Sequence, residues 1–449
     1  MSYSKTFAKY IENVKYEDIP QHIIEFTKLC ILDYYGSLLN GIHERPPKMM
    51  EEVAMILGGT EQATAASGYK TSITNAAFIN GGASHVNELD DIHKSSIVHA
   101  ATVIMPAAIA VAEWKNCTGK QLIEAIIVGY EVAFRIGETV TPAHYYYFHN
   151  TATCGTFGAT AAVCKLLKLS EEQIVNAFGS AGTQAAGLWE FIEDGAMSKQ
   201  LHPGNAGVNG IVSALLAQVG FTGASEILEG KRGFFEAMAK QYNVEKLTVH
   251  LGEQYKIIEN SFKVHASCRH THAAMDLALQ LREKVDVREI SSLYILTYDV
   301  ANTITNNPNP TTIYAAKFSM QFCVALALQK GNGSLYSFNE ETLNDAEIQA
   351  LMKKMSIKVD DQLKQNYPEK WGTKLAVYME NGEAIFLETD YPKGDPENPL
   401  SVEDFISKFY SLCTFEPHKE HIAKSILQLE QLTTKELIAT IHPSTSDTS

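Results

Sequence analysis

Side chains suited to acid–base chemistry gather between residues 85 and 99. The segment holds His85, Glu88, Asp90, Asp91, His93 and His99. Neighbouring carboxylates shift one another's pKa and imidazole titrates near neutral pH, so this mixture suits general acid–base catalysis. If residues 85–92 are helical, His85, Glu88 and Ile92 share one face. A capped helix start with solvated acids, or a metal site, remains an alternative, although the spacing matches no established ligand motif.

A second segment, Ser198–Asn205, places a lysine and a histidine three residues apart. Lys199 and His202 precede the pair Pro203-Gly204, which predicts a break before an Ala- and Gly-rich helix. Cations at that position could face a carboxylate near a helix N-terminus. A surface loop without function is the alternative.

The third segment, residues 262–272, carries the strongest local positive charge in the chain. It holds Lys263, Arg269 and three histidines, among them His272. Arginine binds carboxylates in bidentate fashion and lysine supplies a point charge, so a carboxylate-binding site is one interpretation. A solvated basic turn is the other. A nucleophilic Cys268 is not supported by its sequence neighbours alone.

A lone histidine, His149, follows the aromatic residues 145–148. Taken by itself, such a residue usually serves packing in the core.

Composition excludes several classes of function. The formal net charge is −15, which argues against nucleic acid or an anionic membrane as partner. The seven cysteines are scattered without a C-x-x-C pair, which fits a reducing compartment and neither a disulfide framework nor an iron–sulfur cluster. The N-terminal residues are not a secretory signal, and the apolar stretches are shorter than a membrane span. We therefore expect a cytoplasmic protein.

The hydrophobic pattern changes near residue 262. Before it, apolar residues recur three and four apart, as in 23–34 and 122–134, and further Ala- and Gly-rich stretches indicate buried helices. After it, residues 291–298 and 356–359 read as strands. Residues 374–379 and 384–389 flank an Asn-Gly pair, which predicts a hairpin. Helical stretches are expected at 269–284 and 313–330, and again after residue 400.

These patterns predict a mainly α protein with two domains, because 449 residues exceed the usual size of one core. A large all-helical domain would comprise residues 1–261 and 400–449. A smaller α+β domain would comprise residues 262–399.

Several segments, in this order, resemble the MmgE/PrpD family, which includes 2-methylcitrate dehydratases, cis-aconitate decarboxylases and iminodisuccinate epimerases. They are His85–His99, Gly155–Leu167, Gly182–Asp194 with Ser198–Gly204, Gly220–Phe235, Phe262–His272 and Asp390–Ser401. The last, DYPKGDPENPLS, resembles a family signature, is highly specific and suggests no chemistry of its own. The resemblance implies a helical domain and an α+β lid, a homodimer, and an active site between the domains without metal or cofactor.

The resemblance also implies roles for individual residues. His99 and His149 would be the acid–base groups, with Asp91 tuning them and Lys199 among the catalytic residues. The residues that would hold or orient the substrate are Glu88, Asp90, His202, Lys263, Arg269 and His272. The chain departs from the family pattern at Ile92, where threonine is common, at Ala100, where proline often follows the histidine, and at Phe322, where tyrosine is common. The lost hydroxyls bear on which reaction occurs.

The expected function is that of a lyase acting on a small di- or tricarboxylic acid of the 2-methylcitrate or cis-aconitate type. Cations would stabilise a carbanion beside a carboxylate, and histidines would move the proton. An epimerase of an aminodicarboxylate such as iminodisuccinate is the alternative within the family. Outside it, a metal-dependent hydrolase or lyase would use Asp90, Asp91, His93 and His99 as ligands, and a helical scaffold would have no activity.

Overall fold

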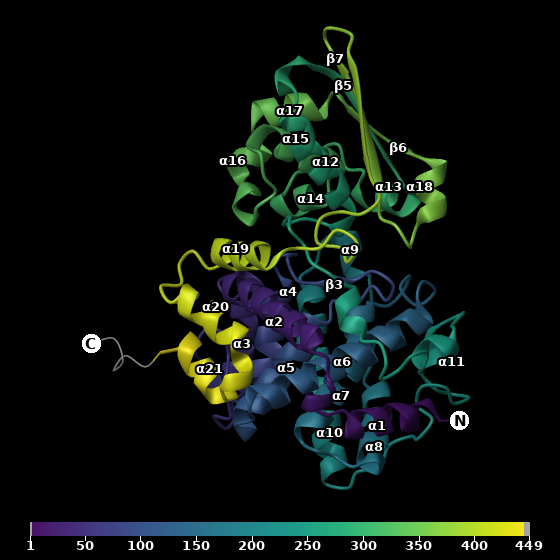
Figure 1. Ribbon diagram of the computed structural model, residues 1–449, viewed down its shortest axis with the longest axis vertical. Helices are drawn as coiled ribbons and strands as arrows, with labels where there is room; N and C mark the ends of the chain where they lie inside the picture. Colours follow the sequence, from purple (N-terminus) through teal and green to yellow (C-terminus); the bar gives the residue numbers. More distant parts are fainter. Residues whose placement is uncertain (1, 444–449) are drawn as a thin grey trace. The chain divides into compact units, whose positions relative to one another are not determined.

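The computed structural model describes residues 2–443, which divide into two compact units (Figure 1). The first unit comprises residues 2–86, 90–260 and 401–443, and the second comprises residues 87–89 and 261–400. The predicted mainly α fold with a smaller α+β part is confirmed.

The first unit is built from helices, with strands of only two residues. Its helices are α1 (Tyr3–Asn13), α2 (Gln21–Gly41), α3 (Arg45–Leu57), α4 (Ile73–His85), α5 (Ala101–Lys115), α6 (Gly119–Val140), α7 (Asn150–Leu166), α8 (Glu171–Gly182), α9 (Phe191–Asp194), α10 (Ser198–Gln218), α11 (Phe234–Met238), α19 (Val402–Leu412), α20 (Lys419–Leu427) and α21 (Thr434–Ile441). Its strands include β1 (Ala63–Thr64), β2 (Lys70–Thr71) and β3 (Ile92–His93).

Small residues let the central helices of this unit approach closely. Every residue of α5 from Ala101 to Glu113 is buried. Where α6 meets α7, a Cβ on Gly129 would lie 2.9 Å from the carbonyl oxygen of Gly158, closer than side chains tolerate. Glycine at this contact is therefore required by the packing rather than by the backbone angles. Thr118 begins α6 with a capping box.

The C-terminal helices belong to the first unit. The backbone N–H of Gly119 donates to the carbonyl of Leu432 at 2.7 Å, and α19 packs on α2 (Figure 1). A partly buried ion pair between Lys408 Nζ and Asp33 Oδ1, 2.6 Å apart, joins these two helices. Residues 401–443 therefore complete the helical first unit after the chain has formed the second unit.

The second unit consists of a four-stranded sheet and helices. Its strands are β5 (Ile290–Thr297), β6 (Met355–Val359), β7 (Thr373–Met379) and β8 (Ala384–Thr389), in the order β6-β5-β7-β8. Its helices are α12 (His272–Arg282), α13 (Asp299–Thr305), α14 (Ile313–Lys317), α15 (Met320–Lys330), α16 (Glu340–Leu343), α17 (Ala346–Met352) and α18 (Asp361–Asn366). The short strand β4 (Asn260–Ser261) lies at the junction of the units.

The hairpin predicted around Asn-Gly is confirmed, with β7 and β8 antiparallel and Gly382 in the turn at φ +88°. The helical stretch expected over 313–330 consists of two helices. The first ends at Lys317, and Ser319 caps the second by accepting a hydrogen bond from Phe322 N at 3.1 Å.

All seven cysteines lie in the described part of the chain, where all are buried and none takes part in a disulfide bond. Burial raises the pKa of Cys154 and of Cys323 to about 12. Within residues 2–443, no helix is both long enough and apolar enough to cross a lipid bilayer.

Candidate active site

The segment between α4 and α5 is a folded loop that carries most of the acidic candidates. Helix α4 ends at His85, and Glu88 follows with φ 58° in the left-handed region. That angle rules out the helical alternative for residues 85–92. The loop then forms β3, and α5 begins at Ala101.

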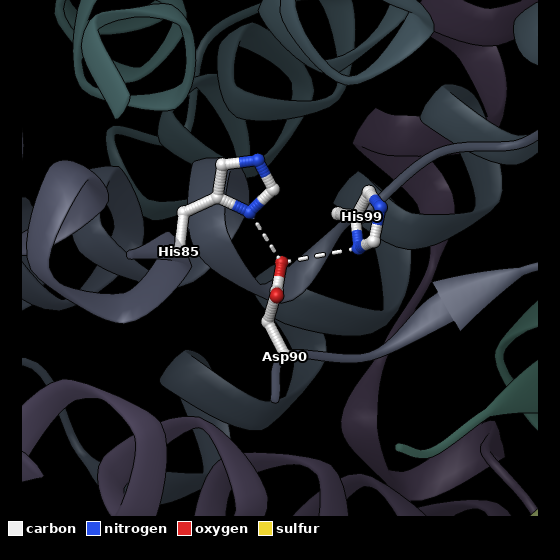
Figure 2. Close-up of side chains that lie close together, drawn as sticks. All are labelled: His85, Asp90 and His99. Atoms are coloured by element: carbon white, nitrogen blue, oxygen red, sulfur yellow. Dashed lines mark hydrogen bonds and ion pairs between the residues drawn. The ribbon is translucent and has the colours of Figure 1, made fainter. Parts of the chain in front are cut away.

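Two histidines face one carboxylate in this loop. His85 Nδ1 lies 2.6 Å and His99 Nδ1 lies 3.1 Å from the same Oδ2 of Asp90. Dashed lines in Figure 2 mark both contacts. His99 Nδ1 also lies 2.6 Å from the backbone oxygen of Asp91. A backbone carbonyl only accepts, so Nδ1 of His99 carries the proton and Nε2 is the basic nitrogen of the neutral ring. The loop therefore fixes the tautomer of His99.

Asp91 is buried, and its carboxyl group lies among hydrogen-bond donors. Its Oδ2 accepts from the hydroxyl of Tyr130 at 2.8 Å and from the side-chain amide of Asn260 at 2.6 Å. Its Oδ1 accepts from the backbone of Ala101 at 3.1 Å. Burial raises the pKa of Asp91 to about 7, and Asp90 adds to the rise, whereas the three donors oppose it.

The raised pKa of Asp91 predicts a pH dependence of stability. Between about pH 4 and pH 7 the folded protein keeps a proton on Asp91 that the unfolded chain has lost. The free energy of unfolding therefore falls as pH rises through this window and levels off above it. We expect Asp91→Asn, which has no proton to lose, to flatten that decline in urea unfolding measured from pH 4.5 to 8. An unchanged slope would contradict the assignment.

A second group of bases lies beside this loop. His149 precedes α7, and its backbone N–H donates to the carbonyl of Gly187 at 3.0 Å. Its ring stacks on His85, with centroids 5.7 Å apart, and its Nδ1 lies 3.1 Å from Nδ1 of His202 on α10. Lys199 lies one helical turn before His202 and is buried.

Burial and neighbouring bases lower the pKa of His149 and of His202. Burial, followed by the charges of His85, His202, Lys199 and His99, holds the pKa of His149 well below its usual range. Burial, followed by His85 and Lys199, lowers the pKa of His202 to about 4. Both rings are therefore neutral near pH 7. The structure brings His99, His149, Asp90, Asp91, Lys199 and His202 together within the first unit.

The remaining candidates lie within the second unit, where Lys263 and Arg269 form buried ion pairs. Lys263 Nζ lies 3.0 Å from Glu88 Oε2, and both side chains are buried. Arg269 binds Asp395 and donates to the carbonyl of Phe262 at 3.0 Å.

His272 has both ring nitrogens occupied in the second unit. Its Nδ1 lies 3.0 Å from Nη1 of Arg269, and its Nε2 lies 3.3 Å from the carbonyl oxygen of Ser267. Guanidinium only donates and a carbonyl only accepts, so the ring is neutral with its proton on Nε2. Burial, and next the charge of Arg269, lowers the pKa of His272 well below its usual range.

Two groups of side chains in the described part of the chain could offer ligand atoms to a metal. One is His85, Asp90 and His99; the other is His93, Glu138 and Glu259. The ligands expected for a metal enzyme therefore do not form one site. Asp90 and His99 belong to the first group, whereas His93 belongs to the second. In the second group, Lys256 Nζ forms ion pairs with Glu138 and Glu259 at 3.1 and 3.0 Å, so the ammonium group of this lysine already bridges the two carboxylates.

Comparison with known protein families decides the classification. The MmgE/PrpD N-terminal domain matches residues 5–247, and the MmgE/PrpD C-terminal domain matches residues 265–431. The chain belongs to the MmgE/PrpD family. The resemblance inferred from the sequence segments is thereby confirmed.

Relatives within the MmgE/PrpD family carry the names of two activities. A cis-aconitate decarboxylase of Mus musculus is 26% identical, with 91% of this chain and 86% of the relative covered. A cis-aconitate decarboxylase of Aspergillus terreus is 25% identical, with 94% of this chain and 92% of the relative covered. A mitochondrial 2-methylcitrate dehydratase of Yarrowia lipolytica is 22% identical, with 89% of this chain and 82% of the relative covered. Both activities are lyase reactions, and the MmgE/PrpD protein described here is an enzyme of that class.

The MmgE/PrpD signature segment 390–401 has a structural role that its sequence did not suggest. Asp395 is the carboxylate that binds Arg269. Gly394 has φ +92° and accepts a hydrogen bond from Phe262 N at 2.8 Å, and a Cβ there would lie 2.2 Å from the Phe262 oxygen. The segment therefore fastens the stretch that carries Lys263 and Arg269.

Sequence reasoning missed three residues of the site. His85 was noted without a role, yet it shares Asp90 with His99, and its Nε2 is buried without a hydrogen-bond partner among the described residues. Tyr130 lies in an apolar helical pattern, and Asn260 lies 169 residues from Asp91, so only the tertiary fold reveals either contact. Ile92 and Phe322, the departures from the family pattern, are both buried.

Proposed function

We propose that this enzyme decarboxylates a small tricarboxylic acid of the cis-aconitate type, using acid–base groups of its own chain. The observation that carries the proposal is the fixed tautomer of His99, held by Asp90 and the Asp91 carbonyl beside the neutral ring of His149. The ring centroids of these two histidines are 6.3 Å apart. The two named decarboxylases that cover about nine tenths of the chain support this choice of reaction.

The reaction requires charge stabilisation and one proton. Loss of CO₂ breaks a C–C bond and leaves its electron pair on a carbon conjugated with a remaining carboxylate. A preorganised cation stabilises that charge in a water-poor site. Lys199 is the cation that lies with the histidines in the first unit, and we assign it this role. His99 and His149 are the groups that deliver the proton to the carbon.

Lys263, Arg269 and His272 remain proposed substrate-binding residues on the strength of the family resemblance. Their existing partners set a condition for that role. A substrate carboxylate at Lys263 has to share the ammonium group with Glu88, and one at Arg269 has to share the guanidinium with Asp395.

Dehydration of a 2-methylcitrate-type acid is the second candidate, favoured by the named dehydratase relative. It needs a base to remove a proton from carbon and an acid to protonate the leaving hydroxyl. The neutral His149 and the fixed His99 offer both functions.

Proton NMR in D₂O separates these reactions. Chelator-treated enzyme is incubated in separate tubes with cis-aconitate, 2-methylcitrate, citrate and iminodisuccinate. We expect cis-aconitate to lose a carboxyl group and gain deuterium at one carbon. A new alkene from 2-methylcitrate alone would replace decarboxylation by dehydration, and exchange in iminodisuccinate alone would indicate epimerisation. Activity that appears only before chelation would instead support a metal-dependent lyase.

We also propose a homodimer, as the family resemblance implies. Sedimentation velocity at micromolar concentration tests it, and a single species with the mass of one 49.5 kDa chain would refute it.

A further inference from the structure

Two histidine rings of the first unit meet through the same type of nitrogen. Nδ1 of His149 and Nδ1 of His202 are 3.1 Å apart, which is hydrogen-bond distance. His149 is 1% exposed, whereas His202, on the second turn of α10, is partly exposed. The contact therefore links an inner ring to an outer one.

This contact ties the protonation states of the two rings together. One Nδ1 must donate and the other must accept. A neutral imidazole carries one proton, so the donor ring has no proton on Nε2 and the acceptor ring has one there. The two Nε2 atoms are therefore complementary: when His149 Nε2 is an acid, His202 Nε2 is a base, and the reverse.

The surroundings keep the pair from taking up a second proton. The titratable groups that act on these rings are His85, His99 and Lys199. Each is basic, so each opposes a positive charge on the pair. The rings of Trp189 and Phe191 pack against the pair at centroid distances of 4.9 and 5.5 Å and limit its hydration.

We propose that His202 is a relay residue that passes protons between solvent and His149 while both rings stay neutral. As His149 Nε2 gives its proton to the substrate carbon, the N–H bond breaks and a C–H bond forms. The shared proton moves from His202 Nδ1 to His149 Nδ1, and a solvent acid protonates His202 Nε2. The pair resets when water donates to His149 Nε2, the shared proton returns from His149 Nδ1 to His202 Nδ1, and the hydroxide so formed takes up the proton that His202 Nε2 releases.

The relay deepens the proposed function and rests on it. Decarboxylation consumes one proton in each turnover, whereas dehydration returns to the leaving hydroxyl the proton that it takes from carbon. A path to solvent is thus required for the first reaction. His202 acts through His149, which distinguishes this role from the carboxylate binding that the family resemblance implies for it.

The first test needs no turnover. In protein labelled with ¹⁵N-histidine, we expect NMR to show a scalar coupling between the two Nδ1 nuclei across the shared proton. The coupling should vanish in His202→Gln and persist in His250→Gln, which alters an exposed histidine paired with Glu253. Absence of the coupling in the wild-type protein would overturn the relay whatever the enzyme does.

The second test measures kcat in dilute buffer. We expect His202→Gln to lose about tenfold or more in kcat with little change in KM, because proton delivery slows while substrate binding persists. Added imidazole should restore kcat by supplying the missing acid, and His250→Gln should behave as wild type. Full kcat without imidazole, or a loss that imidazole does not repair, would overturn the relay.

The two tests keep the proposals apart. If the wild-type enzyme turns over none of the four acids, the proposed function is refuted. The coupling between His149 and His202 then still shows whether the two rings share a proton. Turnover in the wild type combined with a buffer-independent His202→Gln refutes the relay and leaves the lyase assignment intact.

Discussion

His99→Gln is expected to lower kcat by about 10²–10⁴-fold, the usual contribution of a positioned acid–base group. The ring of His99 has its Nδ1 proton directed to Asp90 and to the Asp91 carbonyl, so its Nε2 is prepared to exchange a proton. Glutamine retains a hydrogen-bonding side chain but cannot carry the proton. Turnover of cis-aconitate, followed by NMR, measures the loss.

Two comparisons make the His99 result specific. Thermal unfolding of His99→Gln should stay close to wild type, so the loss does not reflect an unfolded protein. Asp90→Asn keeps one acceptor oxygen beside His85 and His99 and should lose less activity than His99→Gln. Wild-type kcat in His99→Gln would refute the assignment of His99 as an acid–base group and leave His149 in that role.

Asp395→Asn is expected to lower the free energy of unfolding by about 3–5 kcal/mol, because it leaves the Arg269 guanidinium buried without its counter-ion. Arg269 is 4% exposed and Asp395 is fully buried. Removing one partner of a buried pair therefore costs far more than the net value of the pair itself. Urea unfolding at pH 7, followed by circular dichroism, measures the change.

The same signature segment supplies a matched control. Asp390 pairs with Lys370 at 2.6 Å, but both side chains are exposed. Asp390→Asn should therefore cost no more than about 1 kcal/mol. Similar losses for the two variants would show that the segment does not stabilise the protein through the Arg269 pair.

Local patterns predicted the elements that depend on neighbours in sequence. The hairpin of β7 and β8 followed from alternation around Asn-Gly, and α6 followed from the apolar residues three and four apart in 122–134. The parallel pairing of β5 with β6 did not follow, because the strands are far apart in the chain and nothing local specifies a partner. The break at Ser319 was missed because apolar periodicity continues on both sides of it.

The site followed the same division. The segment 85–99 was identifiable from its acids and histidines. Its spacing did not predict the loop conformation, with Glu88 at φ 58°, in which His85 and His99 contact one carboxylate. Lys263 looked like part of either a solvated turn or a carboxylate site, and its partner Glu88 lies 175 residues away. Long-range charge pairing leaves no signal in a single sequence.

Because every cysteine is buried, the reactivity of each thiol reports when the part of the protein around it unfolds. Thiol reagents attack exposed thiolates, so the folded enzyme should resist alkylation. Cys268 and Cys323 belong to the second unit and the other five to the first. Pulsed alkylation in rising urea, read peptide by peptide, would therefore map unfolding onto the two units without any added label.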